Sequence, residues 1–330
     1  MSGKRVLITG GSGFIGANLA RRALSDGHEV HLLLRPAHQT WRIDEIAHDL
    51  RLHFAGLEQR DQVSAAIRTI RPEWIFHLAA FGAYSSQQGF EHMVQTNVIG
   101  CASLLEACLE AEFEAFVNCG SSSEYGFKDH PATEEELVQP NSHYAITKAA
   151  ATHYCNYAGS VHEAKVITLR LYSIYGPYEE PSRLIPTLLV HALHEKLPPL
   201  VSSRTARDYV YVDDACDAMM RVAERSANLL SGIYNVCTGV QTSMDELVSI
   251  TKRLFHVLCE PQWGTMDQRS WDTDVWVGSP AKLQRSAGWQ ARTQVTEGLQ
   301  STVAWLRDHP HWLEFYSRRI FGEFNCRDTT

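Results

Sequence analysis

The chain has 330 residues, of which 44% are hydrophobic, and this length predicts one large domain with a smaller one. A formal net charge of −8, with no basic cluster longer than two residues, argues against nucleic acid or an anionic membrane as the main partner. No apolar run approaches the roughly 20 residues of a membrane helix, and the first predicted strand leaves no room for a signal peptide, so we expect a cytoplasmic protein.

The first predicted elements form a dinucleotide cradle. Aliphatic residues at 6–8 lead into a cluster of glycines, and apolar residues then recur at helical spacing from Phe14 to Leu24. Glycines in a turn between strand and helix let a pyrophosphate approach the backbone, and the free N–H groups of the new helix attract its phosphates. The residues expected to form the cradle are Gly10, Gly13, Phe14, Ile15 and Gly16.

The second predicted strand, residues 28–34, indicates which cofactor binds. A carboxylate at the end of this strand would bind both ribose hydroxyls of NAD, but this chain has Leu34 and Arg35 there. An arginine can instead pair with the 2′-phosphate of NADP. We therefore favour NADP, with NAD as the alternative.

Strands and helices alternate through the next part of the chain. Residues 52–56, 74–80, 113–119 and 166–171 read as strands, and residues 63–70 as a helix. This alternation predicts an α/β fold with a doubly wound parallel sheet of the Rossmann type. The loop 81–89 leaves the carboxyl end of the fourth strand, where such sheets bind ligands, and Asn97 falls early in the following helix.

Groups suited to acid–base chemistry gather at the same sheet edge. The segment 121–124, three serines and a glutamate, follows the fifth strand. Downstream, Tyr144 and Lys148 are four residues apart and share one face of a predicted helix. A phenol has an unperturbed pKa near ~10, and a neighbouring ammonium lowers it towards neutrality by stabilising the phenolate. The two residues are therefore predicted to form a catalytic pair.

Together these motifs resemble the extended short-chain dehydrogenases/reductases of the nucleotide-sugar epimerase/dehydratase family. The resemblance covers nearly the whole chain and includes the segments 169–177, 207–214 and 288–289. It implies a nucleotide-diphosphate sugar as substrate. It also implies a homodimer formed by the helices around Leu104 and Ala150.

The resemblance assigns roles to the residues at the sheet edge. Tyr144 would be the acid/base on the sugar hydroxyl or ketone, and Lys148 would bind the nicotinamide ribose and lower the pKa of Tyr144. A serine would hold the same sugar oxygen; counting back from Tyr125 gives Ser121, and aligning forward gives Ser122, which we favour. Further cofactor contacts are implied for Leu57, in place of an aspartate that holds adenine in relatives, and for Leu78, Ala79, Ala80 and Asn97.

The second half of the chain is expected to bind the substrate. Arg207 and Arg269 match positions that clamp the diphosphate in relatives, and a fork of N–H donors suits phosphate oxygens. Ser173 stands where the family often has asparagine at the substrate. The other implied substrate contacts are Tyr84, Ser123 and Arg183.

The chain becomes richer in proline after Pro177. We expect residues 1–172 to form the NAD(P)-binding domain, with 209–238 returning to it, and 173–208 and 239–330 to form an interleaved substrate lobe. The eight cysteines lack metal-like spacing, so we expect reduced core thiols and no metal site. Trp305, Trp312 and Phe315 are expected to pack inside the fold.

Three reactions fit the resemblance. The first is an NADPH-dependent 4-keto-reduction of a nucleotide deoxy-sugar, because Arg35 favours NADPH. The alternatives are a 4,6-dehydratase, in which Glu124 would be the C5 base, and a 4-epimerase, both with a recycled cofactor. A non-catalytic Rossmann scaffold is a more remote alternative, against which the intact Tyr144 and Lys148 argue.

Overall fold

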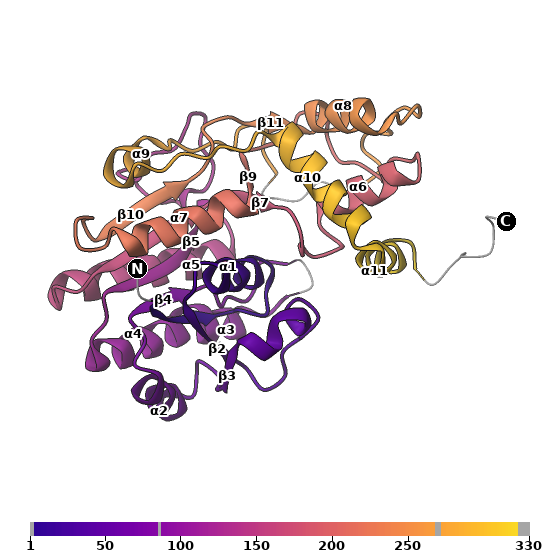
Figure 1. Cartoon of the computed structure of the whole chain (residues 1–330). Helices are drawn as coiled ribbons and strands as arrows, with labels where there is room; N and C mark the ends of the chain where they lie inside the picture. The colour runs from indigo at the N-terminus through magenta and orange to yellow at the C-terminus, as the bar shows by residue number, and fades with distance from the viewer. Residues whose placement is uncertain (1–2, 85–86, 268–271, 323–330) are drawn as a thin grey trace.

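Seven segments form one parallel sheet in the computed structural model, which describes residues 3–84, 87–267 and 272–322. The strand order is β10-β6-β5-β4-β1-β2-β3, and every neighbouring pair is parallel (Figure 1). This is the expected Rossmann arrangement. The strands are β1 (Arg5–Thr9), β2 (Glu29–Leu34), β3 (Arg51–Phe54), β4 (Trp74–His77), β5 (Ala115–Ser121), β6 (Val166–Leu171) and β10 (Gly232–Val236).

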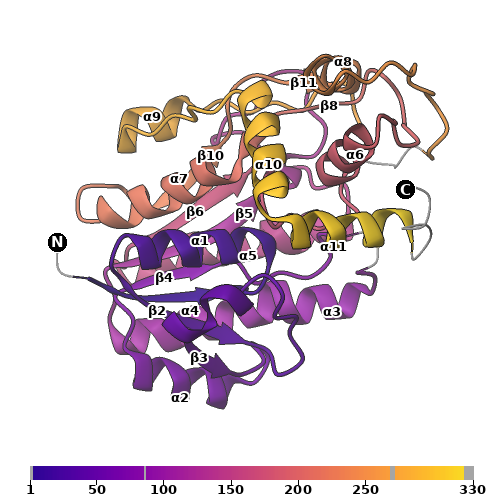
Figure 2. The same ribbon diagram turned by 45° about the vertical axis from the view of Figure 1, so that its right-hand side comes forward.

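Helices cover both faces of the sheet, which is why its strands are almost continuously apolar. α1 (Phe14–Ser25) and α7 (Val212–Glu224) pack on one face, and α2 (Arg60–Ile70), α4 (Gly100–Ala111) and α5 (His143–Val161) on the other (Figure 2). Alternate residues of one strand therefore enter different cores: Val6 and Ile8 join the cluster under α1 and α7, and Leu7 joins the cluster under α2 and α4.

Most of the remaining elements lie beyond the carboxyl end of the sheet, whereas the helix at Ala281–Ala287 packs beside β10 (Figures 1 and 2). Two small sheets pair β7 (Ser173–Tyr175) with β9 (Tyr209–Tyr211) and β8 (Ala206–Arg207) with β11 (Thr242–Ser243). A third core, with Leu188, Leu247 and Leu299 fully buried, joins three of the later helices. The three are α6 (Leu184–Leu193), α8 (Met244–Phe255) and α10 (Val295–Asp308), and the other later helices are α9 (Ala281–Ala287) and α11 (Pro310–Phe321).

Several strands differ from their predicted bounds. β4 ends at His77 and not at residue 80. The last backbone hydrogen bond to β1 is the one that Leu78 N donates to Thr9 O (3.2 Å), and the chain then passes beside the glycine turn at Gly10. β3 and β5 are each shifted from their predicted positions, to 51–54 and 115–121. Between β4 and β5 the chain forms α3 (Phe90–Val94), a π-helical turn at Gln95–Ile99 and then α4. The observed β5 runs directly into the serine cluster.

The C-terminal aromatic residues pack as predicted. On α11, Trp312 and Phe315 contact Trp41, whose ring centroid lies 4.9 Å from that of Phe315. Trp305 of α10 contacts Tyr178 at 4.8 Å. Helix α11 thereby covers the segment that follows β2. All seven cysteines of the described residues are free thiols, and all of these except Cys259 are buried.

Within the described residues, no helix combines the length and apolar character needed to span a bilayer.

Candidate active site

The glycine turn after β1 fits a dinucleotide. Gly10 has φ +69°, and a β-carbon there would lie 2.7 Å from the Ala79 nitrogen. A β-carbon on Gly16 would lie 2.3 Å from Gly10 O, so neither position accepts a side chain. Helix α1 starts at Phe14; its N-cap residue, Gly13, offers no side-chain cap, and its first turn has no acidic residue. Its free N–H groups and positive dipole end therefore suit a pyrophosphate.

The structure places Arg35, the predicted partner of the cofactor 2′-phosphate, directly after β2. Arg35 is exposed directly after the strand, and its carbonyl oxygen lies 3.0 Å from His38 Nδ1. Leu57, after β3, is buried and packs against Gly100, where a β-carbon would lie 2.8 Å from Leu57 Cβ. The structure thus places an apolar side chain at this position, and the cofactor contact of Leu57 stays a prediction.

Asn97 links the loop after β4 to helix α5. Its amide accepts from Phe81 N and donates to Phe81 O, both at 2.8 Å, and it also donates to Thr147 Oγ1 at 2.9 Å. Thr147 precedes Lys148 in the chain, and its hydroxyl donates to Tyr144 O. Asn97 is buried, and these bonds make it a residue that positions both the loop and the helix.

Helix α5 carries the predicted catalytic pair. It begins at His143, where the Ser142 hydroxyl caps it by accepting from Ala145 N at 3.2 Å. Tyr144 is half-buried, and Lys148 is 4% exposed. Among the described residues, none hydrogen-bonds with the Tyr144 hydroxyl or the Lys148 ammonium, so both polar ends are available to ligands.

The serine cluster forms a short 3-10 turn at the end of β5. The Ser121 hydroxyl caps this turn by accepting from Ser123 N at 3.2 Å, and it lies 2.8 Å from Ser123 Oγ. Ser122 is buried, and its Oγ accepts from Trp276 Nε1 at 3.1 Å. Sequence reasoning missed Trp276. Its only signal in the sequence is a tryptophan between two valines, Val275 and Val277, which does not reveal its partner.

Glu124 is a correction to the sequence analysis. Its side chain is 0% exposed, and one oxygen accepts from Arg170 Nε at 2.8 Å. The other oxygen accepts from Ser121 N at 2.8 Å and from Thr152 Oγ1 at 3.1 Å. A carboxylate enclosed by three protein donors cannot reach a sugar carbon. The prediction of a catalytic base was therefore wrong in this geometry, and Glu124 instead holds the turn onto β6.

The predicted substrate arginine Arg207 already has protein partners. It donates to Asp272 Oδ1 at 2.9 Å and to Ala206 O at 2.8 Å. Its guanidinium carbon lies 5.2 Å from the centre of the Trp276 ring. Burial lowers the pKa of Arg207, although the nearby Tyr209 and Asp272 act to raise it. The structure thus joins Arg207 to Ser122 through one indole.

The structure also brings Arg183 and Tyr84 together. Arg183 precedes α6, and its guanidinium carbon lies 5.9 Å from the centre of the Tyr84 ring. Its Nε lies 3.8 Å from Glu179 Oε1. Ser173 opens β7 and donates its N–H to Asp208 O at 3.0 Å. Arg269 lies outside the described residues.

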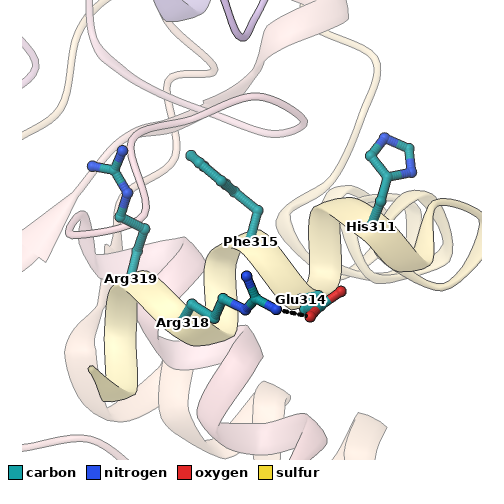
Figure 3. A pocket seen from close by; sticks show the side chains of 5 residues that line it. All are labelled: His311, Glu314, Phe315, Arg318 and Arg319. Carbon is teal, nitrogen blue, oxygen red and sulfur yellow. Dashed lines mark hydrogen bonds and ion pairs between the residues drawn. The ribbon is translucent and has the colours of Figure 1, made fainter. Parts of the chain in front are cut away.

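A hollow of about 340 Å³ on α11 is a separate feature (Figure 3). Its lining side chains all come from this one helix, with Arg318 paired to Glu314. None of the lining residues was predicted to belong to the site. These residues are His311, Glu314, Phe315, Arg318 and Arg319.

A glycine cradle at β1, and a tyrosine and lysine pair on the helix that follows β5, define the short-chain dehydrogenase/reductase class. The family model of the NAD dependent epimerase/dehydratase family matches residues 6–237, and the chain belongs to this family. The expected family and the expected class of NAD(P)-dependent enzyme are thereby confirmed.

Individual relatives are distant but extend over nearly the whole chain. A trifunctional UDP-glucose 4,6-dehydratase/UDP-4-keto-6-deoxy-D-glucose 3,5-epimerase/UDP-4-keto-L-rhamnose-reductase of Arabidopsis thaliana is 26% identical and covers 94% of this chain. The chain spans about half (48%) of the length of that relative. A probable dTDP-glucose 4,6-dehydratase of Sinorhizobium fredii is 27% identical, covering 96% of this chain and 97% of the relative.

A solved structure supports the same grouping. MoeE5 in complex with UDP-glucuronic acid and NAD has a TM-score of 0.79 and is 29% identical, with coverage of 92% of this chain and 99% of that one.

Proposed function

We propose that this protein catalyses the NADPH-dependent reduction of the 4-keto group of a nucleotide-diphosphate deoxy-sugar. The observation that carries the choice of cofactor is Arg35, exposed at the end of β2 where NAD binders place a carboxylate. The names of the relatives support the substrate class, since one includes a UDP-4-keto-L-rhamnose-reductase and another a dTDP-glucose dehydratase.

The residues around the cradle would hold the cofactor. The N–H groups at the start of α1 would bind the pyrophosphate, Arg35 the 2′-phosphate and Lys148 the nicotinamide ribose. When bound, NADPH supplies the hydride that the sugar carbon needs.

The protein's own task is to move the matching proton. Tyr144 donates its phenolic proton to the C4 oxygen, which becomes a hydroxyl, and the ammonium of Lys148 stabilises the phenolate that remains. Ser122, or Ser121 in the other alignment, donates a hydrogen bond to the same oxygen as negative charge develops on it.

The substrate would lie between the serine cluster and the later helices. We propose that Arg207 and Arg183 bind the diphosphate, with Arg207 exchanging its Asp272 partner for a phosphate oxygen. Tyr84 lies beside Arg183 and would contact the same part of the substrate, whereas Ser123 and Ser173 would face the sugar. Arg269 stays a predicted diphosphate ligand, and a cytoplasmic location stays a prediction.

The second candidate is a 4-epimerase that keeps its cofactor. It is favoured by the likeness to a UDP-glucose 4-epimerase of Mycolicibacterium smegmatis, which is 27% identical over 92% of this chain and 99% of that relative. A 4,6-dehydratase is less favoured, because its expected C5 base, Glu124, is enclosed in the ion pair with Arg170.

Calorimetry with NADPH and NADH tests the proposal on wild type and R35A. We expect wild type to bind NADPH more tightly, and R35A to lose roughly 10- to 100-fold in NADPH affinity, the value of a charge-assisted hydrogen bond. NADH binding to R35A serves as the control and should not change. Equal affinities in wild type, or NAD retained through purification, would overturn the reductase and favour the epimerase.

A turnover assay separates the reactions. We expect UDP-4-keto-6-deoxy-D-glucose or its dTDP counterpart to consume one NADPH per sugar reduced, followed at 340 nm. Turnover of a nucleotide sugar without net cofactor consumption would identify an epimerase or a dehydratase. No turnover of any nucleotide sugar, with Y144F as functional as wild type in cells, would support the scaffold alternative.

A further inference from the structure

We propose that Trp276 is a positioning residue that orients the Ser122 hydroxyl towards the sugar oxygen and links this orientation to the diphosphate at Arg207. The inference rests on the proposed function and adds a residue from the C-terminal part of the chain to the machinery.

The chemistry of the indole sets the direction of the bond. An indole Nε1–H can only donate, so in the 3.1 Å contact Ser122 Oγ must be the acceptor. The hydroxyl's own hydrogen is then left for another acceptor. Without the indole, this hydroxyl can rotate and use its hydrogen elsewhere. Trp276 therefore favours the state in which Ser122 donates to a ligand.

The surroundings leave the serine few other partners. Ser122 is buried, and a cavity of only about 10 Å³ lies between it, Tyr172 and Trp276. Such a volume is near the minimum for a single water molecule. The indole is thus the main partner of the hydroxyl on this side.

The backbone around Trp276 is fixed at several points. Trp276 N donates to Gln241 Oε1 at 3.1 Å, and Gly278 N donates to Asp208 Oδ2 at 3.3 Å. Val277 O accepts from Ala132 N at 3.1 Å, which ties the segment to the loop after the serine cluster. These bonds hold the indole against Ser122 while its side chain still contacts Arg207.

The contact with Arg207 carries the link to the substrate. The guanidinium carbon lies 5.2 Å from the centre of the indole ring, within the range of a cation–π interaction. Arg207 also pairs with Asp272, so a diphosphate that replaces Asp272 changes the anion paired with the guanidinium that lies over the indole. A bound diphosphate and the orientation of Ser122 are therefore connected through one side chain.

The first test is W276F, which keeps an aromatic ring beside Arg207 and removes the N–H donor together with the five-membered ring of the indole. In the NADPH-dependent reduction of UDP-4-keto-6-deoxy-D-glucose, we expect kcat to fall roughly three- to tenfold, the value of one hydrogen bond, with KM unchanged. W312F is the matched control, because the Trp312 indole donates to Glu45 Oε1 at 3.2 Å outside the site. W312F should keep the wild-type kcat and KM.

A double-mutant cycle tests whether Trp276 acts through Ser122. We expect S122A to lower kcat by about 10²- to 10³-fold, as loss of a donor to a developing oxyanion does. Adding W276F to S122A should then have no further effect. The inference would be overturned if the kcat losses of S122A and W276F multiply in the double variant. A wild-type kcat in S122A, or an effect of W276F on KM alone, would overturn it as well.

Binding of UDP gives a readout independent of turnover. We expect UDP to change tryptophan fluorescence in wild type and W312F, and this change to be lost in W276F although calorimetry still shows UDP bound. A change that persists in W276F would overturn the link to Arg207. If neither UDP nor dTDP binds to wild type, the proposed function itself fails, and the inference falls with it.

Discussion

At the scale of single residues, Glu124 shows how a neighbour decides the role of a side chain. The order Ser-Glu-Tyr-Gly places a carboxylate beside a serine cluster, which is compatible with a catalytic base. The deciding partner, Arg170, comes from the interior of β6, 46 residues away, and no spacing rule relates the two. The Glu124 carboxylate keeps the pKa of Arg170 raised although burial works against its charge.

Removing the Glu124 carboxylate should lower the stability of the folded protein. In E124A the buried guanidinium of Arg170 loses its counter-charge, and we expect the free energy of unfolding to fall by about 3–5 kcal/mol, measured with urea. The double variant E124L/R170M removes both charges and should recover much of this loss. An E124Q protein with wild-type stability but no turnover would instead restore the role of catalytic base.

Tyr144 should matter for turnover and little for binding. We expect Y144F to lower kcat by about 10²- to 10⁴-fold, because the proton for the C4 oxygen is lost. Calorimetry with NADPH and UDP should give wild-type affinities. Y157F, an exposed phenol on the same helix, is the control and should keep full activity. Comparable kcat values for Y144F and wild type would contradict the assignment.

Glu179 should make stability depend on pH. Burial raises its pKa to about 8, against the opposing effect of Arg183 and Arg42. Among the described residues, none hydrogen-bonds with its Oε2.

The direction follows from the two states of Glu179. In the unfolded chain the carboxyl ionises near ~4.3, whereas the folded protein keeps the proton until about pH 8. The unfolded state thus holds fewer protons in this window, and the free energy of unfolding falls as pH rises through it, by a few kcal/mol at ~1.4 kcal/mol per unit. In E179Q this part of the pH dependence should disappear from urea unfolding curves. Parallel curves for both proteins would contradict the buried proton.

At the scale of elements, α5 has an apolar outer side that the single chain leaves uncovered. Ile146 and Val161 are exposed at helical spacing along it, and Tyr157 between them is 63% exposed. Leu104, which was expected near a dimer contact, is a fully buried residue of α4, the helix that packs on α2. We propose that a second copy covers the outer side of α5.

Charges on this side should separate the dimer. We expect I146E/Y157E to sediment as a monomer at concentrations where wild type is a dimer, because a stable interface needs roughly 1,200–2,000 Å² of buried surface without unpaired charges. L258E, at an exposed site outside α5, controls for added charge and should leave the wild-type species. A monomeric wild type would contradict the proposal.

At the scale of the whole molecule, short-range patterns predicted more than long-range contacts. The strands of the sheet follow from apolar periodicity apart from the bounds of β3, β4 and β5, and parallel crossovers then set the layers. The bond from Trp276 to Ser122 joins residues 154 positions apart and depends on how the later segments fold back. No local pattern encodes such a contact. The same holds for the aromatic packing of α11 on Trp41, where only an apolar helix was foreseeable.

The return of the chain to the sheet at β10 constrains how new specificities could be engineered. β10 pairs with β6, so the segments beyond the sheet leave it and come back before the C-terminal helices begin. A chimera that exchanges these parts between homologues must transfer two separate stretches, one on each side of β9–α7–β10, in a single step. Replacing only the last stretch would pair a foreign Trp276 with a resident Arg207 and Ser122.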